Sequence, residues 1–291
     1  MLSDQFYNKF IKDWKTTDLV KIGDVFIKLE HQNPTGSIKD RGISLQVYNM
    51  LEDGIKRAVI TSSGNAAISA AYYTGKAGIE LDVFVSKKIP EGKLRRIQKY
   101  SNKIHQVSDP LHESAQFASE NNVHNMQQSL NENAPEGFKT IVHEIRNQLN
   151  EQAIKLSDVA IMMPVSSGTT CVGVLRGLEE VNTHTQVHVA QSTAVHTIVE
   201  GLISDLPDRK RSKVSGLVAR STKWKDEVVT SVKTSGGTGW IVDDRLVSKF
   251  ADYLSSLQIA CSLEGALAFA ADSVARTEYK DYPKYSVVLL T

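Results

Sequence analysis

The chain has 291 residues, of which 41% are hydrophobic and 23% charged, and this composition indicates a globular protein rather than a collagenous or disordered one. The charges nearly cancel, with 34 Lys and Arg against 33 Asp and Glu, so no strong field would attract nucleic acid or an acidic membrane. The two cysteines, Cys171 and Cys261, form neither a metal-binding nor a disulfide pattern, and we expect a cytoplasmic protein. No stretch reaches the roughly 20 apolar residues of a membrane span. We therefore expect a small-molecule partner.

Short β-rich runs alternate with longer helical patterns, and this alternation predicts an α/β fold with mostly parallel sheets covered by helices. The predicted strands are Val25–Glu30, Arg57–Ser62, Leu81–Val85, Lys103–Val107, Asp158–Met163, Gln186–Gln191, Trp240–Val242 and Tyr285–Leu290. The predicted helices are Ile38–Glu52, Ala66–Lys76, Gly92–Tyr100, Leu111–Asn121, Phe138–Gln152, Thr170–Val181, Leu246–Ser256 and Leu263–Arg276.

Lys39 is the first candidate for a chemical role. It lies in the segment Asn33-Pro34-Thr35-Gly36-Ser37-Ile38-Lys39-Asp40-Arg41, where proline and glycine mark a turn and Ser37 is a suitable N-cap for the next helix. The helix dipole disfavours a lysine in the first turn, and positive surroundings lower the pKa of its amine and make it a better nucleophile. The alternative is a surface lysine beside Asp40.

The second candidate segment is Thr61-Ser62-Ser63-Gly64-Asn65, which ends a predicted strand and opens a helix. Ligands of parallel α/β sheets bind outside the carboxyl ends of the strands. The hydroxyl and amide side chains, with the backbone N–H groups of the helix start, would suit a carboxylate. A helix cap without a ligand is the alternative.

The third candidate segment, Ser166-Ser167-Gly168-Thr169-Thr170, also joins a predicted strand to a predicted helix. Small residues allow successive N–H groups to surround a phosphate. Because the lysine of a nucleotide-binding P-loop is missing, we expect a simple phosphate monoester rather than a nucleotide. Gly236-Gly237-Thr238-Gly239 precedes a strand instead, and we interpret it as a plain turn.

In this order the three segments resemble the fold-type II pyridoxal-phosphate enzymes, the group of cysteine synthase, threonine synthase, threonine dehydratase and the tryptophan synthase β chain. The resemblance covers the chain from about Val20 to Thr291. It implies that pyridoxal 5′-phosphate is the cofactor and that Lys39 holds it as a Schiff base. It also implies that Ser62, Ser63, Gly64 and Asn65 bind the substrate carboxylate and that Asn65 also contacts the cofactor. The implied contacts of the cofactor's phosphate are Ser166, Ser167, Gly168, Thr169 and Thr170. Thr291 is implied to face the pyridine nitrogen. Relatives usually have glycine where this sequence has Ser166 and Thr169.

The resemblance also implies the architecture and the partners. We expect two packed domains, each a mostly parallel twisted sheet covered by helices, with the cofactor in the cleft between them. The larger, cofactor-anchoring domain would be 1–38 with 146–291, and the smaller, substrate-side domain 39–145. The polar stretch Ser129–Gly137 is expected to cross between the two halves. A small amino acid as substrate and a homodimer are expected.

A neutral hydroxyl at the ring nitrogen favours elimination or replacement over transamination, so β- or γ-substituted amino acids are the expected substrates. Threonine synthase is the subgroup whose motifs are most similar to Lys39-Asp40-Arg41-Gly42, Ser62-Ser63-Gly64-Asn65 and Glu136-Gly137-Phe138-Lys139-Thr140. Threonine synthases usually carry an arginine for the substrate's phosphate at the position of Ala134, and Lys139 is the nearest replacement. Thr170, in the phosphate loop, is more similar to the corresponding motif of cysteine synthase.

Several alternatives stay open from the sequence. Within the family these are cysteine synthase, acting on O-acetylserine or O-phosphoserine, and a threonine or serine dehydratase. A non-catalytic relative could bind cofactor or an amino acid as a sensor, although retention of Lys39 speaks against this. A Rossmann-like nucleotide binder is disfavoured because no GxGxxG follows the early strands.

Overall fold

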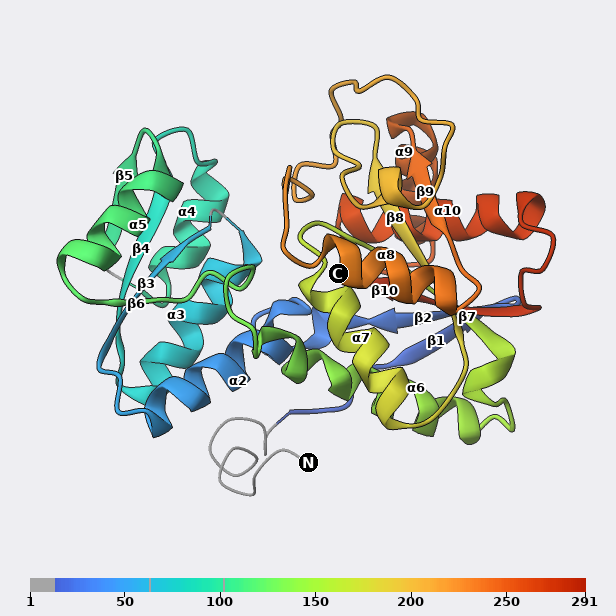
Figure 1. Ribbon diagram of the computed structural model, residues 1–291, viewed down its shortest axis with the longest axis horizontal. Coiled ribbons are helices and arrows are strands. Elements are labelled where there is room, and N and C mark those ends of the chain that lie inside the picture. Colours follow the sequence, from blue (N-terminus) through green and yellow to red (C-terminus); the bar gives the residue numbers. More distant parts are fainter. Residues whose placement is uncertain (1–13, 63, 102) are drawn as a thin grey trace. The chain divides into compact units, whose positions relative to one another are not determined.

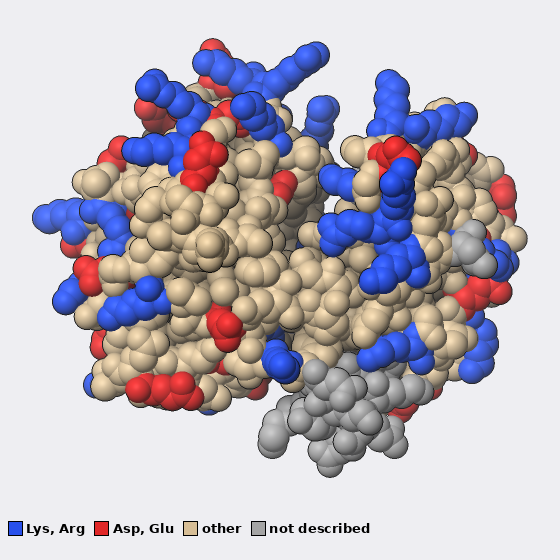
Figure 2. Space-filling model, turned by 180° about the vertical axis from the view of Figure 1, so that it is seen from behind, with Lys and Arg blue, Asp and Glu red and all other residues tan. Residues whose placement is uncertain are grey.

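The computed structural model describes residues 14–62, 64–101 and 103–291. The chain forms two compact units: unit 1 contains 33–137 with residues 14–15, and unit 2 contains 16–32 with 138–291. The domains predicted from the sequence, 1–38 with 146–291 and 39–145, have similar but not identical bounds and stay a prediction. Figure 2 shows Lys and Arg at several places on one face, with Asp and Glu among them.

Unit 1 is built on a four-stranded parallel sheet (Figure 1). Its strand order is β5 (Ile104–Val107), β4 (Glu80–Ser86), β3 (Arg57–Thr61) and β6 (His124–Asn125). Its helices are α2 (Lys39–Glu52), α3 (Asn65–Ala77), α4 (Glu91–Gln98) and α5 (Pro110–Glu120). The core combines apolar strand residues such as Ile60 and Val83 with Ile43 and Val47 of α2 and Ala67 and Ala71 of α3.

Unit 2 is built on a six-stranded sheet in which β1 (Leu19–Ile22) is antiparallel to its neighbour and the other pairs are parallel. The order continues with β2 (Val25–Leu29), β10 (Tyr285–Leu290), β7 (Val159–Pro164), β8 (Gln186–Ser192) and β9 (Gly239–Val242). Its helices are α6 (Thr140–Asn150), α7 (Thr169–Glu180), α8 (Lys225–Thr234), α9 (Asp244–Ser256) and α10 (Leu263–Glu278). The predicted α/β class with two mostly parallel sheets is therefore confirmed.

Helices cover both faces of the unit 2 sheet. Successive strand residues point to opposite sides, so each face has its own set of packed side chains. Ile27, Met162 and Val288 pack in one cluster with α9 and α10. Many buried residues of α10 are alanines, which allow the helix to lie close to the strands. On the opposite face, Lys28 of β2 is fully buried and pairs with Glu144 of α6 at 2.6 Å. A buried lysine requires such a partner.

The structure contains every helix and strand predicted above, and it corrects three details. Helix α2 begins at Lys39, so Ile38 rather than Ser37 is its N-cap; the Ser37 hydroxyl instead accepts from the Lys39 N–H at 3.3 Å. The stretch Ser129–Gly137 is not wholly irregular, because a 3-10 helix runs from Ala134 to Lys139. Strands β1 and β6 and helix α8 were not predicted.

The two cysteines are free, with Cys171 buried and Cys261 half-buried. Among the described residues, no helix is long and apolar enough to cross a membrane. The same part of the chain contains no group of three or more His, Cys, Asp or Glu that could hold a metal ion.

Candidate functional site

Lys39 begins α2, and a network of hydrogen bonds braces the loop before it. The carboxylate of Asp40 accepts from the N–H and from the hydroxyl of Thr35, both at 2.6 Å. The loop turns at Gly36, whose φ of +86° favours glycine and whose N–H donates to the Asn33 carbonyl at 2.8 Å. These contacts fix the backbone from which Lys39 projects.

The Lys39 amine is suited to nucleophilic chemistry. Burial lowers its pKa from 10.5 to about 8, because removing the ammonium from water disfavours the charged form. At pH 8 about half of the amines would then be neutral, compared with well under 1% for an ordinary lysine. Only the neutral amine attacks an aldehyde, so Lys39 meets the requirement predicted for it.

Gly137 packs directly on the first turn of α2. A Cβ atom on Gly137 would lie 2.2 Å from the Arg41 carbonyl oxygen and 2.9 Å from the Gly42 Cα. No other residue fits there without moving the backbone. The glycine of the predicted motif Glu136–Thr140 therefore supports the helix turn that carries Lys39.

The loop Ser62–Asn65 joins β3 to α3, as predicted. The Ser62 hydroxyl accepts from the Gly64 N–H at 3.1 Å, and Gly64 is the N-cap of α3. Ser62, Gly64 and Asn65 are all half-exposed, so a ligand could reach them. The predicted substrate residue Ser63 lies outside the described residues.

Lys39 and Asn65 stand at the same edge of the unit 1 sheet. Helix α2 leads into the amino end of β3, and α3 leaves its carboxyl end, so both helices run opposite to the strand. The two helices pack side by side (Figure 1). Their first residues therefore lie at the edge where parallel sheets bind ligands.

In unit 2 the loop Ser166–Thr170 follows β7 and opens α7, as predicted. Gly168 is the N-cap and has a φ of +88°, and a Cβ there would lie 3.2 Å from the side chains of Trp224 and Val228. The backbone N–H groups of residues 166–170 donate to no acceptor in the described part of the chain. The Ser167 and Thr169 hydroxyls lie 3.1 Å apart and hydrogen-bond to each other. The loop thus presents unpaired donors at a helix N-terminus, the arrangement that binds anions.

A segment that the sequence did not reveal covers this loop. We call Gly216–Thr222 the strap. Its Val218 and Ala219 N–H groups donate to the Ser166 hydroxyl at 3.2 and 3.4 Å, and the Thr222 hydroxyl donates to the Ser167 carbonyl at 2.5 Å. The Ser166 side chain is therefore hydrogen-bonded to the strap.

Thr291 follows β10, the strand next to β7 in the same sheet. Because the two strands are parallel, Thr291 and the loop Ser166–Thr170 both extend from the carboxyl edge. The Thr291 carbonyl accepts from the Ser262 N–H at 3.4 Å, at the start of α10. The structure thus brings two of the predicted contacts of unit 2 to one edge.

Lys139 is not brought to this loop. Its ammonium pairs with Glu180 at 3.4 Å, and Glu180 is the last residue of α7, whereas the loop is at the first. A helix of this length separates its two ends by about 16 Å, at 1.5 Å per residue. The predicted role of Lys139 concerns the substrate's phosphate rather than this loop, and it stays a prediction.

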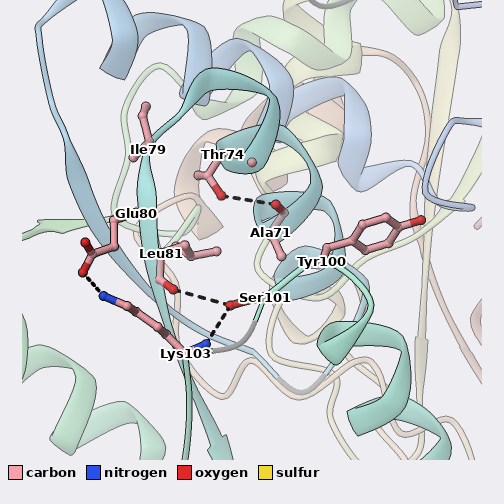
Figure 3. Close-up of a pocket in the computed structure, with 9 residues that line it drawn as sticks. Ala71, Thr74, Ile79, Glu80, Leu81, Tyr100, Ser101 and Lys103 are labelled. Carbon is pink, nitrogen blue, oxygen red and sulfur yellow. Dashed lines mark hydrogen bonds and ion pairs between the residues drawn. The ribbon is translucent and has the colours of Figure 1, made fainter.

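A small cavity of about 160 Å³ lies elsewhere in unit 1, at the amino end of β4 (Figure 3). It lies between the end of α3 and residues Tyr100, Ser101 and Lys103. Lys103 is ion-paired with Glu80, and the Ser101 hydroxyl hydrogen-bonds to the Leu81 carbonyl. The cavity is smaller than typical ligand pockets of roughly 300–1,000 Å³, and it lies at the opposite end of the strands from Lys39 and Asn65. We do not assign it to the site.

The family model described as "Pyridoxal-phosphate dependent enzyme" matches residues 15–291. The chain belongs to this family. It is similar to threonine synthase from Mycobacterium bovis, with 36% identity over 95 residues, which cover 32% of this chain and 26% of that protein. It is also similar to L-serine dehydratase/L-threonine deaminase from Mus musculus, with 27% identity over 188 residues, which cover 63% of this chain and 58% of that protein.

Among solved structures, maize serine racemase is similar, with a TM-score of 0.81 and 19% identity over 98% of this chain and 90% of that chain. Such a likeness shows the fold alone. The pyridoxal-phosphate family predicted from three segments is confirmed, and with it the family's cofactor. The matches cover less than two thirds of the threonine synthase and the dehydratase, so reaction and substrate are left to proposals.

The unit 2 loop fits the phosphate of pyridoxal phosphate in its donor set. The unpaired N–H groups lie at the positive end of α7, a 12-residue helix. Trp224, whose Cβ lies next to Gly168, is buried, and its indole N–H also has no acceptor in the described part of the chain. Buried polar groups are normally hydrogen-bonded, so the unpaired indole N–H is a further donor that a bound anion could satisfy. The chain's own residues are therefore compatible with a bound phosphate.

Proposed function

We propose that this protein uses pyridoxal 5′-phosphate for an elimination or replacement reaction on a small β- or γ-substituted amino acid, with threonine-synthase-like chemistry as the lead. The observation that carries the proposal is Lys39. It begins α2, directly after a loop held by hydrogen bonds, and burial lowers the pKa of its amine to about 8. The bound cofactor would supply an electron-accepting ring that acidifies the substrate's Cα–H. The Lys39 amine would hold the cofactor and later move a proton at that Cα.

The remaining residues would bind and orient. Ser62, Ser63, Gly64 and Asn65 would hold the substrate carboxylate, and Asn65 would also contact the cofactor. The N–H groups of Ser166, Ser167, Gly168, Thr169 and Thr170 would hold the cofactor's phosphate. The Thr291 hydroxyl would be a neutral partner of the ring nitrogen. A neutral partner would leave that nitrogen unprotonated, which would favour elimination or replacement over transamination.

Lys39 can be tested as the attachment point. Borohydride reduction of the cofactor-loaded protein, followed by peptide mapping, should place the label on the peptide that contains Lys39. Lys39→Ala should fold, bind the cofactor weakly and take no label. Label on another lysine in the wild-type protein would refute the assignment.

The reaction can be tested with a substrate panel. Threonine from O-phosphohomoserine would support the lead proposal, and cysteine from O-acetylserine and sulfide would replace it with a cysteine synthase. A dehydratase is the second candidate, because the similarity to the mouse dehydratase extends over 63% of the chain, compared with 32% for threonine synthase. A 2-oxo acid and ammonia from serine or threonine would support it. Cofactor binding without any product would indicate a sensor.

The homodimer and the cytoplasmic location stay predictions. Light scattering of the purified protein would give the mass in solution. A mass near 32.1 kDa would contradict the homodimer.

A further inference from the structure

The strap contains a cation placed beside the phosphate loop. Arg220 lies between Ala219, whose N–H donates to the Ser166 hydroxyl, and Thr222, whose hydroxyl donates to the Ser167 carbonyl. Consecutive Cα atoms are about 3.8 Å apart, and Arg220 is one residue from Ala219 and two residues from Thr222. The strap backbone therefore passes directly beside the first two residues of the loop.

Arg220 has no carboxylate partner in the described residues, unlike Arg176 and Lys225. Arg176 pairs with Glu227 at 3.0 Å, and Lys225 pairs with Glu200 at 2.7 Å. Arg220 is exposed and takes part in no ion pair or hydrogen bond with the described part of the chain. Its guanidinium is therefore available to a ligand.

We propose that Arg220 binds a phosphate group at the loop Ser166–Thr170, either the cofactor's own phosphate or the phosphate of a phosphorylated amino-acid substrate. A guanidinium presents parallel donors that match phosphate oxygens, and the unpaired N–H groups of the loop are further donors for the same anion. The proposal relies on the proposed function only for the molecule that carries the phosphate.

Two measurements on Arg220→Gln and Arg220→Lys distinguish the two sources. The first is the cofactor dissociation constant, followed by the visible absorbance of the bound cofactor. The second is a calorimetric titration of the cofactor-loaded protein with inorganic phosphate. Lys280→Gln is the matched control, because it removes an exposed cation at the turn that precedes β10, at the opposite edge of the same sheet.

A loss of about tenfold or more in cofactor affinity in Arg220→Gln assigns the residue to the cofactor's phosphate, since hydrogen bonds to charged groups contribute about that much. The same loss for inorganic phosphate, with cofactor affinity unchanged, assigns it to the substrate's phosphate. Arg220→Lys should lose about threefold in the same measurement, because it keeps the charge but not the paired donors.

The proposal is overturned if both constants of Arg220→Gln stay within about twofold of the wild type, or if Lys280→Gln changes them equally. Thermal unfolding of the variants checks that the fold is intact, which the exposure of Arg220 leads us to expect. Failure of the proposed function would give a different result from failure of the Arg220 proposal. The wild-type protein would then show no borohydride-stable label on Lys39, while the phosphate titration would still compare wild type and variant.

Discussion

Two loops join a strand to a helix at a sheet edge, Ser62–Asn65 in unit 1 and Ser166–Thr170 in unit 2, but their surroundings hold them differently. The unit 2 loop has a buried glycine with a φ of +88° and three hydrogen bonds from the strap. In the unit 1 loop the described residues Ser62, Gly64 and Asn65 are half-exposed, and the one side-chain hydrogen bond among them is donated by the Gly64 N–H to the Ser62 hydroxyl. A Cβ on Gly64 would meet nothing closer than 4.0 Å in the described chain.

The difference agrees with the two ligands proposed for the loops. A cofactor that stays bound gains from a loop whose conformation is fixed in advance, because no ordering cost arises on binding. A substrate that enters and leaves gains from a loop with few contacts to break, since such segments open at low free-energy cost. We therefore expect changes in the unit 2 loop to act on the cofactor and changes in the unit 1 loop to act on the amino acid.

The largest effect is expected from Gly168→Asp. The new Cβ would meet Trp224 and Val228 at 3.2 Å, and the carboxylate would face the cofactor's phosphate. Two unit charges 4 Å apart repel by about 4 kcal/mol at an effective dielectric constant of 20, so affinity should fall at least roughly 1,000-fold. Cofactor retention after gel filtration measures this directly.

Gly236→Asp is the matched control, because Gly236 also has a positive φ, +79°, but its Cβ would meet only the Gln186 side chain at 3.7 Å. It should lose some stability and keep the cofactor. Cofactor loss in Gly236→Asp alone would move the phosphate to Gly236–Gly239 and remove the basis of the comparison.

The unit 2 loop was predictable from the sequence and the strap was not, for a physical reason. Strand β7 is a continuous apolar run followed by small residues and an apolar helix, and each of these features is local. The strap has no periodic pattern, because its residues are held by hydrogen bonds that they donate to Ser166, Ser167 and Glu264. Such contacts connect positions about 50 residues apart, and a single sequence does not display them.

Helix α8, the ion pair of Lys139 and the pKa of Lys39 also depend on contacts that are distant in the sequence. Helix α8 buries only Val228 and Val232, too few for a helical pattern. The pairing of Lys139 with Glu180 depends on how α6 packs on α7, which the local motif does not contain. The low pKa of Lys39 was expected from the helix dipole, whereas its cause in the structure is burial.

The second prediction concerns the stability of unit 2 at low pH. His188 of β8 is fully buried, and its Nδ1 accepts from the Thr238 N–H and the Trp240 indole N–H, both at 3.2 Å. Burial lowers the pKa of His188 from 6.5 to about 4. The unfolded chain therefore binds the proton more readily, and stability that is complete above pH 6.5 should fall by about 3 kcal/mol as the pH drops towards 4.

Urea unfolding of the wild type and of His188→Asn between pH 7 and 4 measures this, since asparagine offers an acceptor that does not titrate in this range. The variant should lose less stability across the interval. The exposed His184→Gln is the control, and its profile should follow the wild type. Parallel profiles for all three proteins would assign the acid sensitivity to other groups.

The third prediction concerns the unit 1 side. Gly137→Ala would force a Cβ to within 2.2 Å of the Arg41 carbonyl and displace the first turn of α2. We expect about 2 kcal/mol of lost stability and a lower yield of the borohydride label on Lys39. Gly92→Ala in α4 is the control, because nothing lies within 4 Å of its Cβ, and it should not destabilise. Equal effects of the two variants would contradict the support assigned to Gly137.

The fourth prediction tests the strap. Thr222→Val keeps the shape of the side chain and removes the hydrogen bond to the Ser167 carbonyl. Cofactor affinity should fall about fivefold, close to the roughly 1 kcal/mol of one hydrogen bond, while the KM of the amino acid changes little. Cofactor titration and steady-state kinetics on one preparation separate the two quantities. A changed KM with unchanged cofactor affinity would place the strap on the substrate side.

The smallest effect is expected from Ser62→Ala, the counterpart of Thr222→Val in the other loop. It removes the acceptor of the Gly64 N–H, and the loop is half-exposed, so water replaces part of the lost contact. We expect the KM of the amino acid to rise about threefold and cofactor affinity to stay within about twofold. Because the two variants each remove one hydroxyl next to a helix start, the comparison is matched in chemistry. If Ser62→Ala lowered cofactor affinity as much as Thr222→Val does, the two loops would share one role. The difference in the contacts that hold them would then have no functional meaning.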